Sequence, residues 1–154
     1  MSSTVGGPLP FVPLIDGEVE VEDGAELYFR QCNPMFFRAG QPSDLMFKPS
    51  SSDGEKLSGS RSRRATAKAA YEFRNGQKKG STAGTWCISV DEARSVGSRV
   101  VDDAESSEAP PAPIPPGHVY LDLRPFSALD KEERRVLRST LLLASLKWGR
   151  QFPL

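Results

Sequence analysis

The sequence predicts an α+β fold, with a small antiparallel or mixed sheet of about five strands packed by two main helices. Three observations lead to this fold class. Apolar and polar residues alternate strictly in residues 18–22 and 118–123, which is typical of strands. Residues 89–92 and 130–133 have the spacing of a capping box, which predicts a helix start at each place. The 154 residues, 38% of them hydrophobic, suit one domain with one core.

The N-terminal end has a different composition from the rest of the chain. Residues 1–14 contain three prolines and scattered apolar side chains, which favours an extended N-terminal arm over a helix. We expect residues 15–154 to form a single α+β domain with loops at residues 50–62 and 102–117. The first loop is rich in serine, and the second is acidic and then rich in proline.

Three further segments complete the predicted sheet. Residues 26–32 follow the turn signal Asp23-Gly24, so we expect them to pair with residues 18–22 as a hairpin. Residues 44–48 read as a short strand that ends at a proline. Residues 85–90 alternate between apolar and polar side chains, which predicts a half-buried strand.

Two main helices are expected, at residues 63–74 and 131–148. Alanines and long side chains favour the first, and Asn75-Gly76 is a good C-terminal stop for it. The second ends at Gly149 and is apolar nearly all round its last turns, so that end must be buried in the domain or against a partner. The capping box at residues 89–92 predicts one further short helix, which ends near residue 97.

Charge is balanced overall but segregated along the chain. Twenty basic and twenty acidic residues leave no net field to attract nucleic acid or an anionic membrane. Residues 56–79 hold eight basic residues against a single acid, whereas residues 16–26 hold six acids and no base. The basic segment suits a nucleotide, a nucleic acid or an acidic protein surface, unless the acidic segment of the same chain neutralises it.

Several chemistries are disfavoured by composition. One histidine and two well-separated cysteines lack the paired spacings of zinc and haem sites, and we expect no cofactor; carboxylate-bound Mg²⁺ or Ca²⁺ stays open. The glycines near residue 59 resemble an anion site before a helix, but the Walker spacing is absent. The chain carries no signal-peptide pattern and no long apolar run, so we expect a cytoplasmic protein with reduced thiols and no membrane partner.

His118 and Tyr120 are the candidate catalytic residues. They point to the same face of a predicted strand, together with Asp122. His118 and Asp122 are roughly 13 Å apart along that strand, too far for a direct dyad. His118 must therefore act alone or with a group from another strand. Cys32, on the same strand face as Arg30, is an alternative nucleophile.

Three functions are consistent with these patterns. The first is a protein-interaction module in a larger assembly, through another protein or self-association, with Leu142, Leu146 and Trp148 as the interface. Its partner-steering or anion-binding residues are Arg61, Arg63, Arg64 and Lys68.

The alternative is a small enzyme or binder that acts on a nucleotide or nucleic-acid phosphate. Arg30, Arg61 and Arg64 would hold the anion, and His118 or Tyr120 would transfer a proton. This function requires that Arg30 and His118 meet in one cleft. A third hypothesis, a double-stranded nucleic-acid binder that uses the basic segment alone, predicts binding that weakens steeply with salt.

Overall fold

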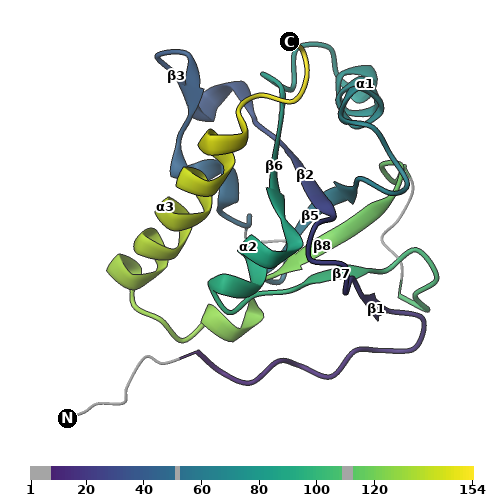
Figure 1. Cartoon of the computed structure of the whole chain (residues 1–154), viewed down its shortest axis with the longest axis vertical. Helices are drawn as coiled ribbons and strands as arrows, with labels where there is room; N and C mark the ends of the chain where they lie inside the picture. Colours follow the sequence, from purple (N-terminus) through teal and green to yellow (C-terminus); the bar gives the residue numbers. More distant parts are fainter. Residues whose placement is uncertain (1–7, 51–52, 109–112) are drawn as a thin grey trace.

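A computed structural model describes residues 8–50, 53–108 and 113–154, and it has an α+β fold (Figure 1). A six-stranded antiparallel sheet has the order β1-β7-β8-β5-β2-β6. Its strands are β1 (Val19–Glu20), β2 (Leu27–Gln31), β5 (Lys56–Arg61), β6 (Thr85–Ser89), β7 (Val100–Asp102) and β8 (His118–Asp122). The helices are α1 (Ala67–Gln77), α2 (Val90–Ser95) and α3 (Lys131–Trp148). The predicted fold class is therefore confirmed.

Both faces of the large sheet are covered. Helix α3 packs along one face, beside β6 and the short 3-10 helix η2 (Asp44–Phe47) (Figure 1). On the opposite face α1 lies against β2 and β6, and Thr85 Oγ1 donates a hydrogen bond to the Ala67 carbonyl of α1. All five residues of β6 are buried as a result. The predicted strand is confirmed, but its predicted half-burial is wrong, because alternation in this strand separates two buried faces.

Local capping signals located two helices correctly. Ser89 and Glu92 form the capping box of α2, and Asp130 and Glu133 form that of α3. Each box satisfies amide donors that a helix start leaves without an internal partner. The first helix is displaced from the prediction: it begins after the N-cap Thr66 and continues through Asn75-Gly76 to Gln77. A glycine near a helix end permits a stop but does not impose one.

The predicted hairpin of residues 18–22 and 26–32 is wrong. β1 pairs with β7, and β2 lies between β5 and β6. Alternation of side chains shows which residues share a face of a strand, but it carries no information on which strand lies alongside. The predicted strand at residues 44–48 is also wrong, because Ser43 accepts a hydrogen bond from the Leu45 amide and caps the 3-10 helix η2.

Strand β5 lies inside residues 50–62, which the composition assigned to a loop and to an anion site before a helix. Gly59 is required here because a Cβ atom would lie 2.4 Å from Tyr28 Cε2 and 2.5 Å from the Phe29 carbonyl oxygen. Glycine in a strand often marks such a close approach. Two residues form each strand of the small second sheet, β3 (Phe37–Arg38) and β4 (Gln41–Pro42).

The described part of the predicted N-terminal arm contacts the body of the domain. The Leu9 amide donates to the Pro125 carbonyl, and Arg99 Nη2 donates to the Val12 carbonyl. The Arg99 guanidinium also lies 4.2 Å from the centre of the Phe11 ring. Residues 1–7 of the predicted arm lie outside the described residues. Within the described ranges, no helix is long and apolar enough to cross a membrane.

Candidate functional site

The site begins where two central strands separate. β2 and β5 pair at Tyr28↔Arg61 and Phe29↔Ser60, and their ladder ends there. Backbone carbonyls of β5 beyond this point need other donors. The Tyr28 hydroxyl donates to the Leu57 carbonyl at 2.8 Å and to the Ser58 carbonyl at 3.1 Å. Arg30 Nη1 donates to the same Ser58 carbonyl at 2.7 Å. Side chains of β2 thus hold the strands apart and open a gap in the sheet.

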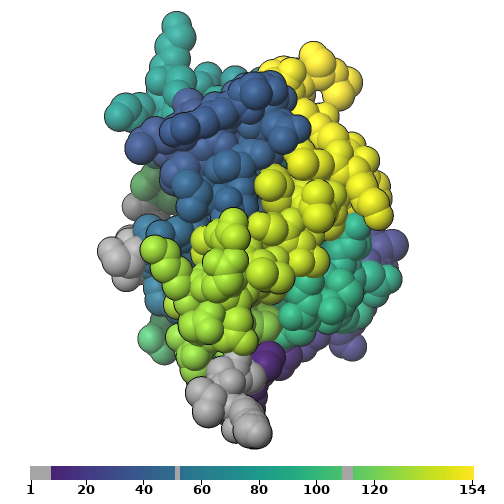
Figure 2. Space-filling model, turned by 90° about the vertical axis from the view of Figure 1, so that its left-hand side faces the viewer, coloured from purple at the N-terminus to yellow at the C-terminus, as the bar shows by residue number. Residues whose placement is uncertain are grey.

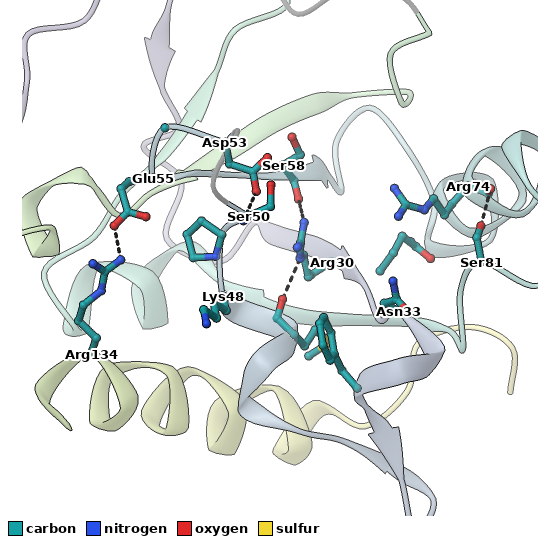
Figure 3. A pocket seen from close by; sticks show the side chains of 15 residues that line it. Arg30, Asn33, Lys48, Ser50, Asp53, Glu55, Ser58, Arg74, Ser81 and Arg134 are labelled. Carbon is teal, nitrogen blue, oxygen red and sulfur yellow. Dashed lines mark hydrogen bonds and ion pairs between the residues drawn. The ribbon is translucent and has the colours of Figure 1, made fainter. Parts of the chain in front are cut away.

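A hollow of about 980 Å³ lies at this gap, and we call it the cationic hollow (Figure 3). Its charged lining residues are Arg30, Lys48, Asp53, Glu55, Arg74 and Arg134. Four of these are basic and two are acidic. Arg134 and Glu55 form an ion pair at one end of the hollow, so the remaining positive charge lies toward Arg30 and Arg74 (Figure 3).

Within the described ranges, three cations of the hollow have no acidic partner. Among the residues that the structure describes, none of Arg30, Lys48 and Arg74 makes an ion pair. Arg30 is nevertheless held in place, because its Nε donates to the Met46 carbonyl at 3.0 Å in addition to its bond with Ser58. Arg74 extends from α1 toward the centre of the hollow (Figure 3).

A second hollow, of about 370 Å³, lies against the face of the sheet that α1 covers. We call it the apolar slot, because its walls include Phe29, Ala70, Phe73, Pro113 and Pro115. The slot and the cationic hollow share the lining residues Arg30, Gln31, Ser58 and Arg74. The slot and the cationic hollow are therefore adjacent.

His118 contacts Ser58, one of the four residues that line both hollows. Its Nε2 lies 3.2 Å from Ser58 Oγ, and its Nδ1 lies 2.7 Å from the Asp103 carboxylate. Because a carboxylate only accepts hydrogen bonds, a neutral His118 ring carries its proton on Nδ1 and presents Nε2 to the serine hydroxyl. Arg30 contacts the Ser58 carbonyl and His118 contacts the Ser58 hydroxyl, but His118 lines neither hollow, so the two residues do not meet in one cleft. Asp122, in contrast, binds Arg99 and Arg124.

The other predicted proton-transfer and nucleophilic groups lie away from the hollows or are unreactive. Tyr120 lines neither hollow, and its hydroxyl donates to Glu18 at 2.8 Å; burial and this carboxylate raise its pKa above the usual range. Cys32 and Cys87 are free and buried. Burial raises the pKa of Cys32 to about 11 and that of Cys87 to about 12, so both thiols stay protonated at neutral pH.

Most of the predicted anion-binding arginines are neutralised by acidic residues of the same chain. Arg61 donates to Glu26 at 2.7 Å and to Asp102 at 2.8 Å. Arg63 pairs with Asp23 at 2.6 Å, and Arg64 lies 3.8 Å from Asp102. We call these three arginines and their acidic partners, Asp23, Glu26 and Asp102, the paired cluster. Lys68 is exposed on α1 and makes no ion pair within the described ranges.

Ionised carboxylates stabilise the paired cluster. Burial opposes the ionisation of Glu26, but hydrogen bonds from the Arg61 side chain and the Arg63 amide outweigh it and lower the pKa of Glu26. Burial likewise opposes the ionisation of Asp102. The Ala104 amide and Arg61 lower the pKa of Asp102 below its ordinary value. The two carboxylates are therefore charged at neutral pH and engage Arg61.

The predicted interface residues of α3 differ in their exposure. Leu142 packs at the edge of the core, and Leu146 is half-buried. Trp148 is 45% exposed, and its Nε1 donates to Glu92 at 2.8 Å. Figure 2 shows α3 along the surface of the molecule beside residues 34–48. The most exposed large apolar side chains of this helix are Val136 and Leu143.

Comparison with known proteins gives no identification. No family model, no curated protein and no solved structure matches the chain. Within the described ranges, no group of three or more His, Cys, Asp and Glu side chains could hold a metal ion.

Proposed function

We propose that this chain binds a nucleotide, with the phosphate in the cationic hollow and the base in the apolar slot. The observation that carries the proposal is the gathering of Arg30, Lys48 and Arg74, without carboxylate partners among the described residues, around a hollow that shares four lining residues with the slot. This proposal differs in its anion-binding residues from the nucleotide enzyme or binder inferred from the sequence. Arg61 and Arg64 belong to the paired cluster, so other cations would bind the phosphate.

The cationic hollow contains positively charged hydrogen-bond donors, which are the groups that bind phosphate. Charge-assisted hydrogen bonds to phosphate are stronger than neutral ones, and a guanidinium presents several donors in one plane. Arg30 is ordered before any ligand arrives, because the Met46 and Ser58 carbonyls hold its Nε and Nη1. Such preorganisation reduces the conformational entropy that binding would otherwise cost.

The slot offers a base two aromatic side chains. Phe29 and Phe73 line it together with two prolines, and its volume of about 370 Å³ is within the usual range of small-molecule pockets. Stacking of a base on an aromatic ring contributes about 1–3 kcal/mol and depends little on which base is present. We therefore expect nucleotides to bind with little preference for one base.

Calorimetric titration of the purified chain with adenosine monophosphate, adenosine and inorganic phosphate tests the proposal. The nucleotide should bind more tightly than either part alone, and its affinity should fall as salt is added. The double variant Lys48→Ala/Arg74→Ala should raise the Kd about a hundredfold, at about 1.4 kcal/mol for each lost charge. Lys78→Ala/Lys79→Ala is the matched control, since both lysines are exposed and lie outside the two hollows.

Two results would overturn the proposal. One is the absence of nucleotide binding at low salt. The other is an equal loss of affinity in the two double variants, because the nucleotide would then respond to the general positive charge around α1 and not to the hollow.

Protein interaction through α3 is a second candidate function. It is favoured by Val136, Leu143 and Trp148, which are 57%, 65% and 45% exposed on one helix. Light scattering coupled to size exclusion should then find an oligomer, and Val136→Lys/Leu143→Lys should convert it to a folded monomer. If the wild-type chain is monomeric at every concentration, self-association through α3 is excluded.

A further inference from the structure

We propose that Ser58 is the nucleophile of a phosphoester hydrolase, with His118 as general base and Asp103 as its positioning residue. The inference rests on the proposed function, since the substrate is the phosphate ester of a bound nucleotide. Ser58, His118 and Asp103 come from β5, from β8 and from the residue that follows β7, and β7, β8 and β5 are neighbours in the sheet. The sheet thus brings together residues that are 15 and 60 positions apart.

Exposure distinguishes the three residues in the way that the reaction requires. Ser58 is exposed and is a lining residue of both hollows. His118 and Asp103 are each 7% exposed, which keeps water from competing for their hydrogen bond. A nucleophilic hydroxyl, a base within reach and a third group that orients the base are the three parts of a serine–histidine–carboxylate triad.

The hydrogen bonds also have the direction that proton transfer needs. Asp103 accepts from Nδ1 of His118 at 2.7 Å, and this bond holds the ring with Nε2 toward Ser58. The Ser58 hydroxyl can then donate to Nε2, at a heavy-atom separation of 3.2 Å. This distance is at the long end of the range for a base and its proton donor before substrate binds.

The cations near Ser58 suit a phosphoryl group as the electrophile. Arg30 bonds the Ser58 carbonyl, and Arg74 lines both hollows together with Ser58. Guanidinium groups stabilise the charge on the equatorial oxygens of a transferring phosphoryl group. The apolar slot would hold the nucleoside part.

The reaction balances without a cofactor. In the first step the Ser58 oxygen attacks phosphorus and forms a P–O bond, while the bond from phosphorus to the leaving oxygen breaks. His118 takes the hydroxyl proton of Ser58 and gives it to that leaving oxygen. In the second step water loses a proton to His118 and attacks phosphorus. The bond from phosphorus to Ser58 breaks, and Ser58 regains the proton.

The test uses p-nitrophenyl phosphate as the probe, with the full chain. Release of p-nitrophenol should occur, and intact mass after acid quenching should reveal one phosphoryl group on Ser58. Ser58→Ala should abolish both signals and still bind adenosine monophosphate. Ser95→Ala, which removes an exposed serine on α2, should change neither.

A third variant tests the triad without removing the nucleophile or the base. Asp103→Asn should slow turnover by roughly 10³–10⁴-fold with a folded circular dichroism spectrum, because the amide no longer holds the reactive tautomer of His118. If the chain binds the nucleotide but shows neither turnover nor adduct, the inference is wrong and the proposed function stands. Faster Ser58-dependent hydrolysis of p-nitrophenyl acetate would overturn the phosphoester assignment. If the wild-type chain does not bind the nucleotide, both the hydrolase inference and the proposed nucleotide-binding function are wrong.

Discussion

The paired cluster and the cationic hollow contain the same kind of side chain in opposite situations. In the paired cluster Arg61 is 14% exposed and is bound by Glu26 and Asp102. In the hollow Arg30 is bound only by backbone carbonyls among the described residues, and its charge is not neutralised. The density of basic residues along the chain therefore does not indicate which of them are available to a ligand.

The antiparallel pairing of β2 and β5 explains the difference. Glu26 lies just before β2, beside Arg61 at the end of β5, and the two side chains meet there. At the other end of this pairing the two strands separate, and Arg30 lies in the gap. One pair of strands thus places a neutralised arginine at one end and an available arginine at the other.

Among the variants that test this comparison, Glu26→Ala should change the free energy of unfolding most. The variant removes the main partner of Arg61, and loss of one member of a buried ion pair costs about 3 kcal/mol or more. The free energy of unfolding from urea titration should fall by that amount, with nucleotide affinity unchanged. Glu22→Ala is the control, since Glu22 is exposed. A change below 1 kcal/mol, on the scale of exposed pairs, would show that the cluster is not a buried network.

A smaller effect is expected from Arg30→Lys, which keeps the charge of the hollow. Lysine cannot bond the Met46 and Ser58 carbonyls with one planar group, so at least one of these two hydrogen bonds is lost. We expect a loss of about 1–2 kcal/mol in unfolding free energy and about tenfold in nucleotide affinity. Full retention of both quantities, measured by urea titration and calorimetry, would mean that the arrangement of Arg30 is unimportant.

The smallest expected effect is on how the free energy of unfolding depends on pH. The pKa values of Glu26 and Asp102 are lowered in the folded chain, so each carboxylate stabilises the fold above its unfolded pKa. That stabilisation is lost as the pH falls through the folded pKa values. Unfolding free energy measured in urea from neutral to acidic pH should therefore decline less steeply in Glu26→Gln than in the wild type. Identical slopes would contradict this assignment.

Local signals in the sequence predicted part of the fold. The capping boxes at Ser89 and Asp130 lie within one helical turn, and both helices begin where these residues indicate. Pairing between strands depends on distant contacts, and there the hairpin prediction failed. β5 was missed because the serines and Gly59 that allow close packing have the composition of a loop.

The candidate site was predicted in part for the same reason. Arg30 and His118 were identified, because a lone histidine and a basic residue in a strand are visible in the sequence. Ser58, Asp103, Lys48 and Arg74 were not, since nothing in the sequence marks these particular residues within a predicted loop, linker, strand and helix. The order of strands β7-β8-β5-β2 brings Asp103, His118, Ser58 and Arg30 together, whereas Lys48 follows η2 and Arg74 lies on α1.

The most direct test of the account compares one arginine from each region. Arg63 and Arg74 are both exposed, but Arg63 pairs with Asp23 in the paired cluster and Arg74 lines the hollow. Calorimetry with adenosine monophosphate on Arg74→Gln and Arg63→Gln should give about a tenfold rise in Kd for the first variant and none for the second. Equal losses, or a larger loss for Arg63→Gln, would contradict the claim that the hollow is the binding site.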